Sequence, residues 1–136
     1  MDNQILLEQL FSFWPQVNIV RWVPALDSLT KICIVNFKGH KTLVLLDELV
    51  YTSEKFGVIY LTGRMQQIKT LMSKYQCTAG LFITVNKKLS RQVYKTAMSK
   101  RINLVDMDDF RGICHKLNCP YLINFLTIQV NLDLIT

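Results

Sequence analysis

The chain has 136 residues, of which 50% are hydrophobic and 19% charged, and its mean hydropathy is +0.20. This length and composition predict one globular domain with a sizeable core, and they exclude a disordered tail or a collagen-like polymer. The formal charge of +6 comes from 16 Lys and Arg against 10 Asp and Glu.

The positive charge is concentrated in residues 55–105, which carry ten basic residues and no acidic one. The rest of the chain then holds six basic and ten acidic residues, a net charge of −4. Such an asymmetry indicates a polyanionic partner. The basic residues of this segment are Lys55, Arg64, Lys69, Lys74, Lys87, Lys88, Arg91, Lys95, Lys100 and Arg101.

Several classes of protein do not fit the sequence. No uninterrupted apolar stretch reaches about 18 residues, so neither a membrane span nor a membrane partner is expected. Asp2 and Glu8 stand where a secretory signal would have a basic region, which argues against secretion. The four cysteines are too sparse for a disulfide scaffold in a chain with its own core. We therefore expect reduced thiols and a cytoplasmic location.

The first half of the chain predicts one helix followed by strands. Apolar residues at helical spacing predict an N-terminal helix within residues 1–15, where Pro15 ends the pattern. Segments rich in β-branched and aromatic residues then predict a strand meander over residues 17–62. Its expected strands are 17–22, 31–37, 42–51 and 56–61, with a tight turn at 38–40 and with Gly63 ending the meander.

The second half, residues 63–117, predicts alternating helices and strands. Apolar strands of this kind, separated by helices, favour parallel pairing through crossover helices. Residues 118–136 are apolar and fit either a helix or a last strand. The expected elements are helices at 65–75, 89–99 and 107–116 and strands at 79–85 and 102–105.

The segment 77–110 resembles the C-terminal half of Mrr-type restriction endonucleases. The resemblance rests on the strings TAGLFITV (78–85), LSRQVYKTA (89–97) and INLVD (102–106). In that family a strand with small, aromatic and Thr residues precedes a helix and then a short strand ending in an acidic residue. The resemblance implies a single α/β domain with a restriction-endonuclease-like mixed sheet flanked by helices.

The resemblance also implies a site. In the family, an Asp on one hairpin strand and a Glu/Gln-x-Lys pair on the next hold Mg²⁺ and activate water. On this chain the three catalytic positions fall on Asp47, Thr62 and Arg64. Asp47 matches, with Glu54 or Glu48 as a second candidate metal ligand, whereas Thr62 offers only a neutral hydroxyl and Arg64 stays cationic. We therefore expect an altered, inactive nuclease site, with Mg²⁺ as cofactor if the site is active and none otherwise.

The expected helix at 89–99 carries a second signal. Lys88, Arg91 and Lys95 lie on the face opposite Leu89, Val93 and Ala97, and Lys87 precedes them. Such a basic face can follow a phosphate backbone. Arg64 is a further candidate, because a guanidinium suits a bidentate phosphate contact. The predicted nucleic-acid-binding residues are Arg64, Lys87, Lys88, Arg91 and Lys95.

The sequence therefore predicts a nucleic-acid-binding protein with an altered nuclease site, and DNA is favoured over RNA as its partner. One alternative is an active Mg²⁺-dependent endonuclease that takes its second ligand from Glu48 or Glu54. Another is a protein-interaction module or homodimer, in which residues 120–136 present apolar surface to a partner or to a second copy.

Overall fold

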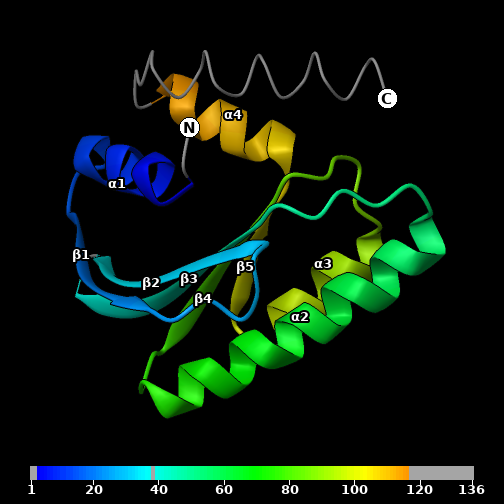
Figure 1. Ribbon diagram of the computed structural model, residues 1–136, viewed down its shortest axis with the longest axis horizontal. Coiled ribbons are helices and arrows are strands. Elements are labelled where there is room, and N and C mark those ends of the chain that lie inside the picture. The colour runs from blue at the N-terminus through cyan, green and yellow to red at the C-terminus, as the bar shows by residue number, and fades with distance from the viewer. Residues whose placement is uncertain (1–2, 38, 117–136) are drawn as a thin grey trace.

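A computed structural model describes residues 3–37 and 39–116 of the chain. They form one sheet of five strands with helices on both of its faces (Figure 1). The elements in chain order are α1 (Asn3–Phe13), β1 (Val17–Val23), β2 (Thr30–Phe37), β3 (His40–Asp47), α2 (Glu54–Lys74), β4 (Ala79–Thr84), α3 (Arg91–Ser99), β5 (Ile102–Val105) and α4 (Met107–Lys116).

The strands follow one another across the sheet in the order β1-β2-β3-β4-β5. β1, β2 and β3 pair antiparallel, and Phe37 pairs with His40 at the turn between β2 and β3, where Gly39 has a positive φ of 84°. β3, β4 and β5 pair parallel, which requires the crossover connections that α2 and α3 supply. The sheet is therefore mixed, and β3 joins its antiparallel and parallel parts.

Successive side chains of β3 point to opposite faces of the sheet, and both faces are buried. Leu43 and Leu45 belong to the core that α2 and α3 cover, whereas Val44 and Leu46 belong to the core beneath α1 and α4. Figure 1 shows the same division, with α1 and α4 above the sheet and α2 and α3 below it. By this alternation the next residue, Asp47, points toward the α2 side.

The fold class predicted from the resemblance, a single α/β domain with a mixed sheet flanked by helices, is confirmed. The N-terminal helix, the β2–β3 hairpin and the parallel strands joined by helices are all present. The predicted segment 118–136 lies outside the described residues. Within residues 3–37 and 39–116, no helix combines the length and the apolar character needed to cross a membrane.

The predicted strand at 56–61 is wrong, and Gly63 does not end a meander. Residues 54–74 form one continuous helix of 21 residues, so the meander has three strands and stops at Asp47. A short apolar run does not distinguish a strand from a helix. Here Phe56 and Ile59 are 51% and 66% exposed, which shows that the run lies on a helix with one buried face.

The start of α2 is set by local chemistry. The Ser53 hydroxyl accepts a hydrogen bond from the backbone N–H of Phe56 at 3.3 Å, and Glu54 lies in the first turn, where negative charge is favourable. The buried positions then recur every three or four residues from Gly57 through Leu61 and Met65. This spacing fixes the face of α2 that packs on the sheet.

Two glycines of α2 provide a matched test of this helix. At the exposed Gly63 an added Cβ meets nothing within 4 Å. We expect Gly63→Ala to raise the free energy of unfolding by about 0.5–1 kcal/mol, because alanine favours the helix. At Gly57 a Cβ would overlap the ring of Tyr51, so Gly57→Ala should lower it by about 1–3 kcal/mol. Urea denaturation measures both, and equal effects would contradict the packing of Tyr51 on α2.

Candidate functional site

Asp47 ends β3 in a buried position, with an exposed fraction of 1%. One carboxylate oxygen, Oδ1, accepts the backbone N–H of Leu49 at 2.9 Å. The other, Oδ2, accepts the Tyr60 hydroxyl at 2.7 Å and Arg64 Nε at 2.8 Å. Three protein donors therefore surround this carboxylate, and its charge is compensated by an arginine.

Arg64 lies on the sheet-facing side of α2 and is 6% exposed. Besides Asp47 it binds a second carboxylate, since its Nη2 lies 2.6 Å from Asp27 Oδ2. Nη2 also donates to the Tyr60 hydroxyl at 2.8 Å, and Nη1 donates to Gln67 Oε1 at 2.9 Å. We call Asp27, Asp47, Tyr60, Arg64 and Gln67 the arginine cluster.

Asp27 reaches the arginine cluster from the loop between β1 and β2. Its Oδ1 accepts the backbone N–H of Leu29 at 2.9 Å, which fixes the turn, and its side chain is 43% exposed. The cluster thus joins the β1–β2 loop, the end of β3 and the middle of α2, and the guanidinium bridges two carboxylates at 2.6 and 2.8 Å.

The electrostatics of the arginine cluster favour its charged state. The hydrogen bond from Arg64 is the largest influence on the pKa of Asp27 and lowers it, against the effect of burial. Burial acts against the charge of Arg64, but the hydrogen bonds to Asp27 and Asp47 outweigh it and raise the pKa of the guanidinium. An arginine of this kind stays cationic and cannot serve as a general base.

Burial, together with the hydrogen bond to Asp47, raises the pKa of Tyr60 to about 12 from an ordinary 10.0. The folded state holds the Tyr60 proton more tightly than the unfolded state does. The protonated hydroxyl therefore contributes its full share to the free energy of unfolding below pH 10, and this contribution is lost as the pH rises toward 12. We expect the difference in unfolding free energy between the native chain and Tyr60→Phe to shrink over this range. Urea denaturation at a series of pH values checks it, and a constant difference would contradict the Tyr60–Asp47 hydrogen bond.

The residues present do not fit the Mg²⁺ ion that the resemblance implies. Mg²⁺ needs several oxygen ligands, whereas Asp47 already accepts hydrogen bonds from three protein donors, one of which is the Arg64 guanidinium. Within the described part of the chain, no three His, Cys, Asp or Glu side chains are placed to share a metal ion. Glu48 and Glu54 are both exposed, and neither joins Asp47 in such a group.

The structure brings together only two of the three predicted catalytic positions. Asp47 and Arg64 touch, but Thr62 is exposed on α2. Residues two apart share a face on a strand but not on a helix, so the predicted strand geometry of Thr62 and Arg64 does not exist. Sequence reasoning missed Asp27 and Tyr60. The spacing of Tyr60 and Arg64, four residues on one helix, is the signal that could have linked those two.

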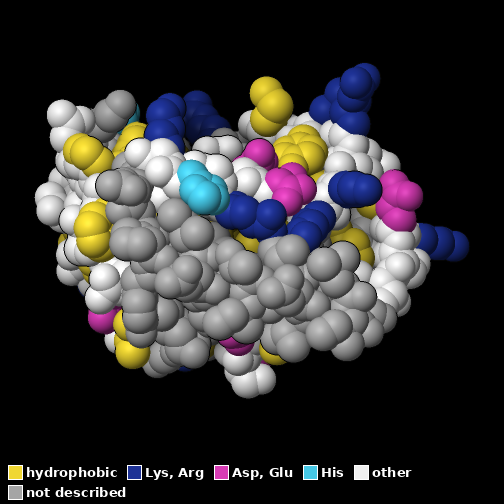
Figure 2. All heavy atoms as spheres, turned by 90° about the horizontal axis from the view of Figure 1, so that it is seen from above, with side chains coloured by type: hydrophobic (Ala, Val, Ile, Leu, Met, Phe, Trp, Pro, Cys, Tyr) yellow, Lys and Arg dark blue, Asp and Glu magenta, His cyan; other side chains and the backbone are white. Residues whose placement is uncertain are grey.

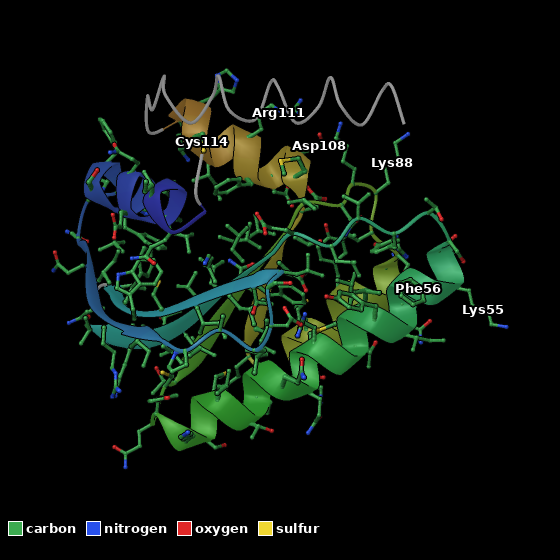
Figure 3. The ribbon with its side chains drawn as sticks, in the orientation of Figure 1. Lys55, Phe56, Lys88, Asp108, Arg111 and Cys114 are labelled. Carbon is green, nitrogen blue, oxygen red and sulfur yellow. The ribbon has the colours of Figure 1, made fainter. Side chains whose placement is uncertain are left out.

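The predicted basic face is present in part on α3. Arg91 and Lys95 are exposed, one turn apart, while Val93 and Ala97 are buried on the opposite side. Lys87 and Lys88 do not belong to the helix, which begins at Arg91 after the N-cap Ser90. They lie in the loop between β4 and α3. In Figure 3 the Lys88 side chain points to the side of the sheet that carries α4 and Asp108, whereas Lys55 and Phe56 mark the start of α2 on the other side.

We call Lys87, Lys88, Arg91 and Lys95 the basic face. Within the described residues, none of the four forms an ion pair, whereas the charge of Arg64 is taken up by Asp27 and Asp47. In the view of Figure 2, onto the side of the molecule that carries α4, acidic and basic side chains lie next to one another. The helices α2 and α3 differ, because Glu54 is the one acidic residue in either of them.

Comparison with known proteins supports the family resemblance. Residues 62–114 match the family model of the Mrr catalytic domain, described as a restriction endonuclease. The match begins within α2 and ends within α4, so it includes Thr62, Arg64 and the basic face but neither Asp27 nor Asp47. No curated protein and no solved structure matched the chain.

Proposed function

We propose that this chain, a restriction-endonuclease-like protein of the Mrr type, binds nucleic acid through its basic face and does not hydrolyse it. DNA is the favoured partner, because the family is one of restriction endonucleases. The single observation that carries the proposal is the arginine cluster. In this cluster the side chain of Arg64 forms an ion pair with Asp47, the carboxylate that the family would use to bind a metal ion.

Binding is supported by the placement of the basic residues. Of the ten Lys and Arg in residues 55–105, only Arg64 is buried, and the others are exposed or half-buried. α2 and α3 cover the same side of the sheet, and Glu54 is the one acidic residue in either helix. A local excess of basic over acidic side chains attracts phosphates over a distance.

Loss of hydrolysis is supported by what faces Asp47. The resemblance puts the Glu/Gln and Lys at positions 62 and 64, which hold Thr and Arg and lie on the helix α2 rather than on a strand. The cation that does reach Asp47 is Arg64, which holds its proton. The site therefore lacks both the second metal ligand and the group that would activate water.

We further propose a reducing, cytoplasmic location. Cys33 and Cys77 are free thiols, and burial raises the pKa of Cys33 to about 12, so this cysteine is unreactive. A protein partner or a second copy remains compatible with binding, since the residues proposed for such a contact, 120–136, lie outside the described part of the chain.

The test is incubation of the purified protein with plasmid, linear duplex and single-stranded DNA in Mg²⁺ or Mn²⁺. We expect no cleavage with either metal ion. Asp47→Asn serves as the control, because it removes the one carboxylate at the expected catalytic position. Metal-dependent cleavage that this variant abolishes would refute the proposal, and cleavage that it leaves unchanged would identify a contaminant.

A further inference from the structure

A cavity of about 270 Å³ lies next to the basic face, between the segment that leads into α2 and the segment that leads into α3. Tyr51, Thr52, Glu54 and Val58 line it from the α2 side. Lys87, Lys88, Ser90 and Val93 line it from the α3 side. The volume is close to the lower end of the roughly 300–1,000 Å³ of small-molecule sites, so the cavity suits one small group.

The α2 side of this cavity is held in place by packing and by hydrogen bonds. The ring of Tyr51 lies against Gly57, where the absence of a Cβ makes room for it. The backbone N–H of Tyr51 donates to Asn86 Oδ1 at 3.1 Å, and Asn86 Nδ2 donates to the Leu49 carbonyl at 2.7 Å. Asn86 is 6% exposed, so this connection between the two segments is buried. The cavity is thus formed before any ligand arrives.

The chemistry of the lining differs from one side to the other. Lys87 and Lys88 present cations on the α3 side, next to the exposed Arg91. Glu54 presents an acceptor on the α2 side, and Val58 and Val93 add apolar surface to the lining. The groups of a nucleotide are complementary to this lining. A nucleotide has an anionic phosphate, a flat base with an apolar face, and, in adenine, cytosine and guanine, an amino group that can donate to a carboxylate.

Resting on the proposed binding function, we propose that this cavity accepts one unpaired nucleotide of the bound DNA. The phosphate lies at Lys87 and Lys88, and the base lies against Tyr51 and Val58. A base inside a duplex cannot enter, so the nucleotide comes from a single-stranded end or gap. The protein therefore binds DNA with an unpaired segment in preference to fully paired DNA.

The test compares a blunt duplex with a duplex of the same length that carries a short adenine overhang, by fluorescence anisotropy. The native chain should bind the overhang more tightly by about fivefold or more, the lower end of what one stacked base contributes. Val58→Phe fills the cavity and should abolish the preference while leaving the affinity for the blunt duplex and its salt dependence unchanged. Ile59→Phe, at the neighbouring exposed position, is the control and should keep the preference.

Circular dichroism confirms that each variant is folded. If Val58→Phe does not fold, Thr52→Trp fills the same cavity from an exposed position. Equal affinity of the native chain for the two duplexes, or a preference that survives filling of the cavity, would overturn the inference and leave the proposed function intact. Absence of binding to either duplex would instead overturn the proposed function.

Discussion

Replacement of Arg64 by methionine is expected to lower the free energy of unfolding by about 3–5 kcal/mol, the loss typical when one partner of a buried ion pair is removed. Asp47 is 1% exposed, so without Arg64 its charge would remain in the interior with only the donors of Leu49 and Tyr60. Arg64→Lys should not restore stability, because an ammonium group cannot reach Asp47, Asp27 and Gln67 at once. Urea denaturation at neutral pH measures the loss.

A double-mutant cycle separates this effect from ordinary loss of packing. Arg64→Met combined with Asp47→Leu should be more stable than Arg64→Met alone, because the second change removes the unpaired charge. Asp27→Asn is the matched control at the exposed end of the cluster and should have a much smaller effect. Additive effects in the cycle would show that Arg64 and Asp47 do not interact.

Reversal of two charges on the basic face is expected to produce the largest change in function. Lys88→Glu with Arg91→Glu should weaken binding to duplex DNA by at least tenfold at about 0.1 M salt and lower the magnitude of the salt slope by about 2. The physical reason is that binding releases about one counterion from the DNA for each phosphate contact, so a variant with two contacts fewer releases about two counterions fewer. Anisotropy titrations with a labelled duplex at several salt concentrations give both quantities.

The control must change the net charge equally while sparing the basic face. Lys31→Glu with Lys116→Glu meets this condition, since both residues lie outside 55–105 and carry the same charge change. We expect this control to keep most of the affinity and the slope of the native chain. Equal losses in the two double variants would mean that net charge, rather than the basic face, governs binding.

Most of the fold follows from sequence patterns that depend on neighbouring residues. The β2–β3 hairpin and the helices α1, α3 and α4 were predictable because turn residues, caps and apolar periodicity act locally. The N-terminal half of α2 was not, because its apolar run of β-branched and aromatic residues fits a strand equally well. Ser53 and the spacing of Gly57, Leu61 and Met65 favour the helix only when they are read together with residues 65–75.

The candidate site was less predictable than the fold, because it depends on contacts between distant residues. Asp27 and Arg64 are 37 positions apart, and nothing in either neighbourhood indicates the other. The wrong prediction of a strand at 56–61 also made the predicted site wrong. On a strand Thr62 and Arg64 would share a face, whereas on α2 Thr62 is exposed and Arg64 is buried. The pattern of the basic face was predictable only in part, because Arg91 and Lys95 lie on α3 as expected whereas Lys87 and Lys88 precede the helix.

The central claim, that this nuclease-like fold binds DNA without cutting it, is tested most directly by one titration in the presence of Mn²⁺. The substrate is a duplex with a fluorophore and a quencher on opposite sides of its centre, so that anisotropy reports binding and loss of quenching reports cleavage. We predict saturable, salt-dependent binding with no loss of quenching over many hours. Loss of quenching that disappears in Asp47→Asn, or no binding at low salt, would contradict the account.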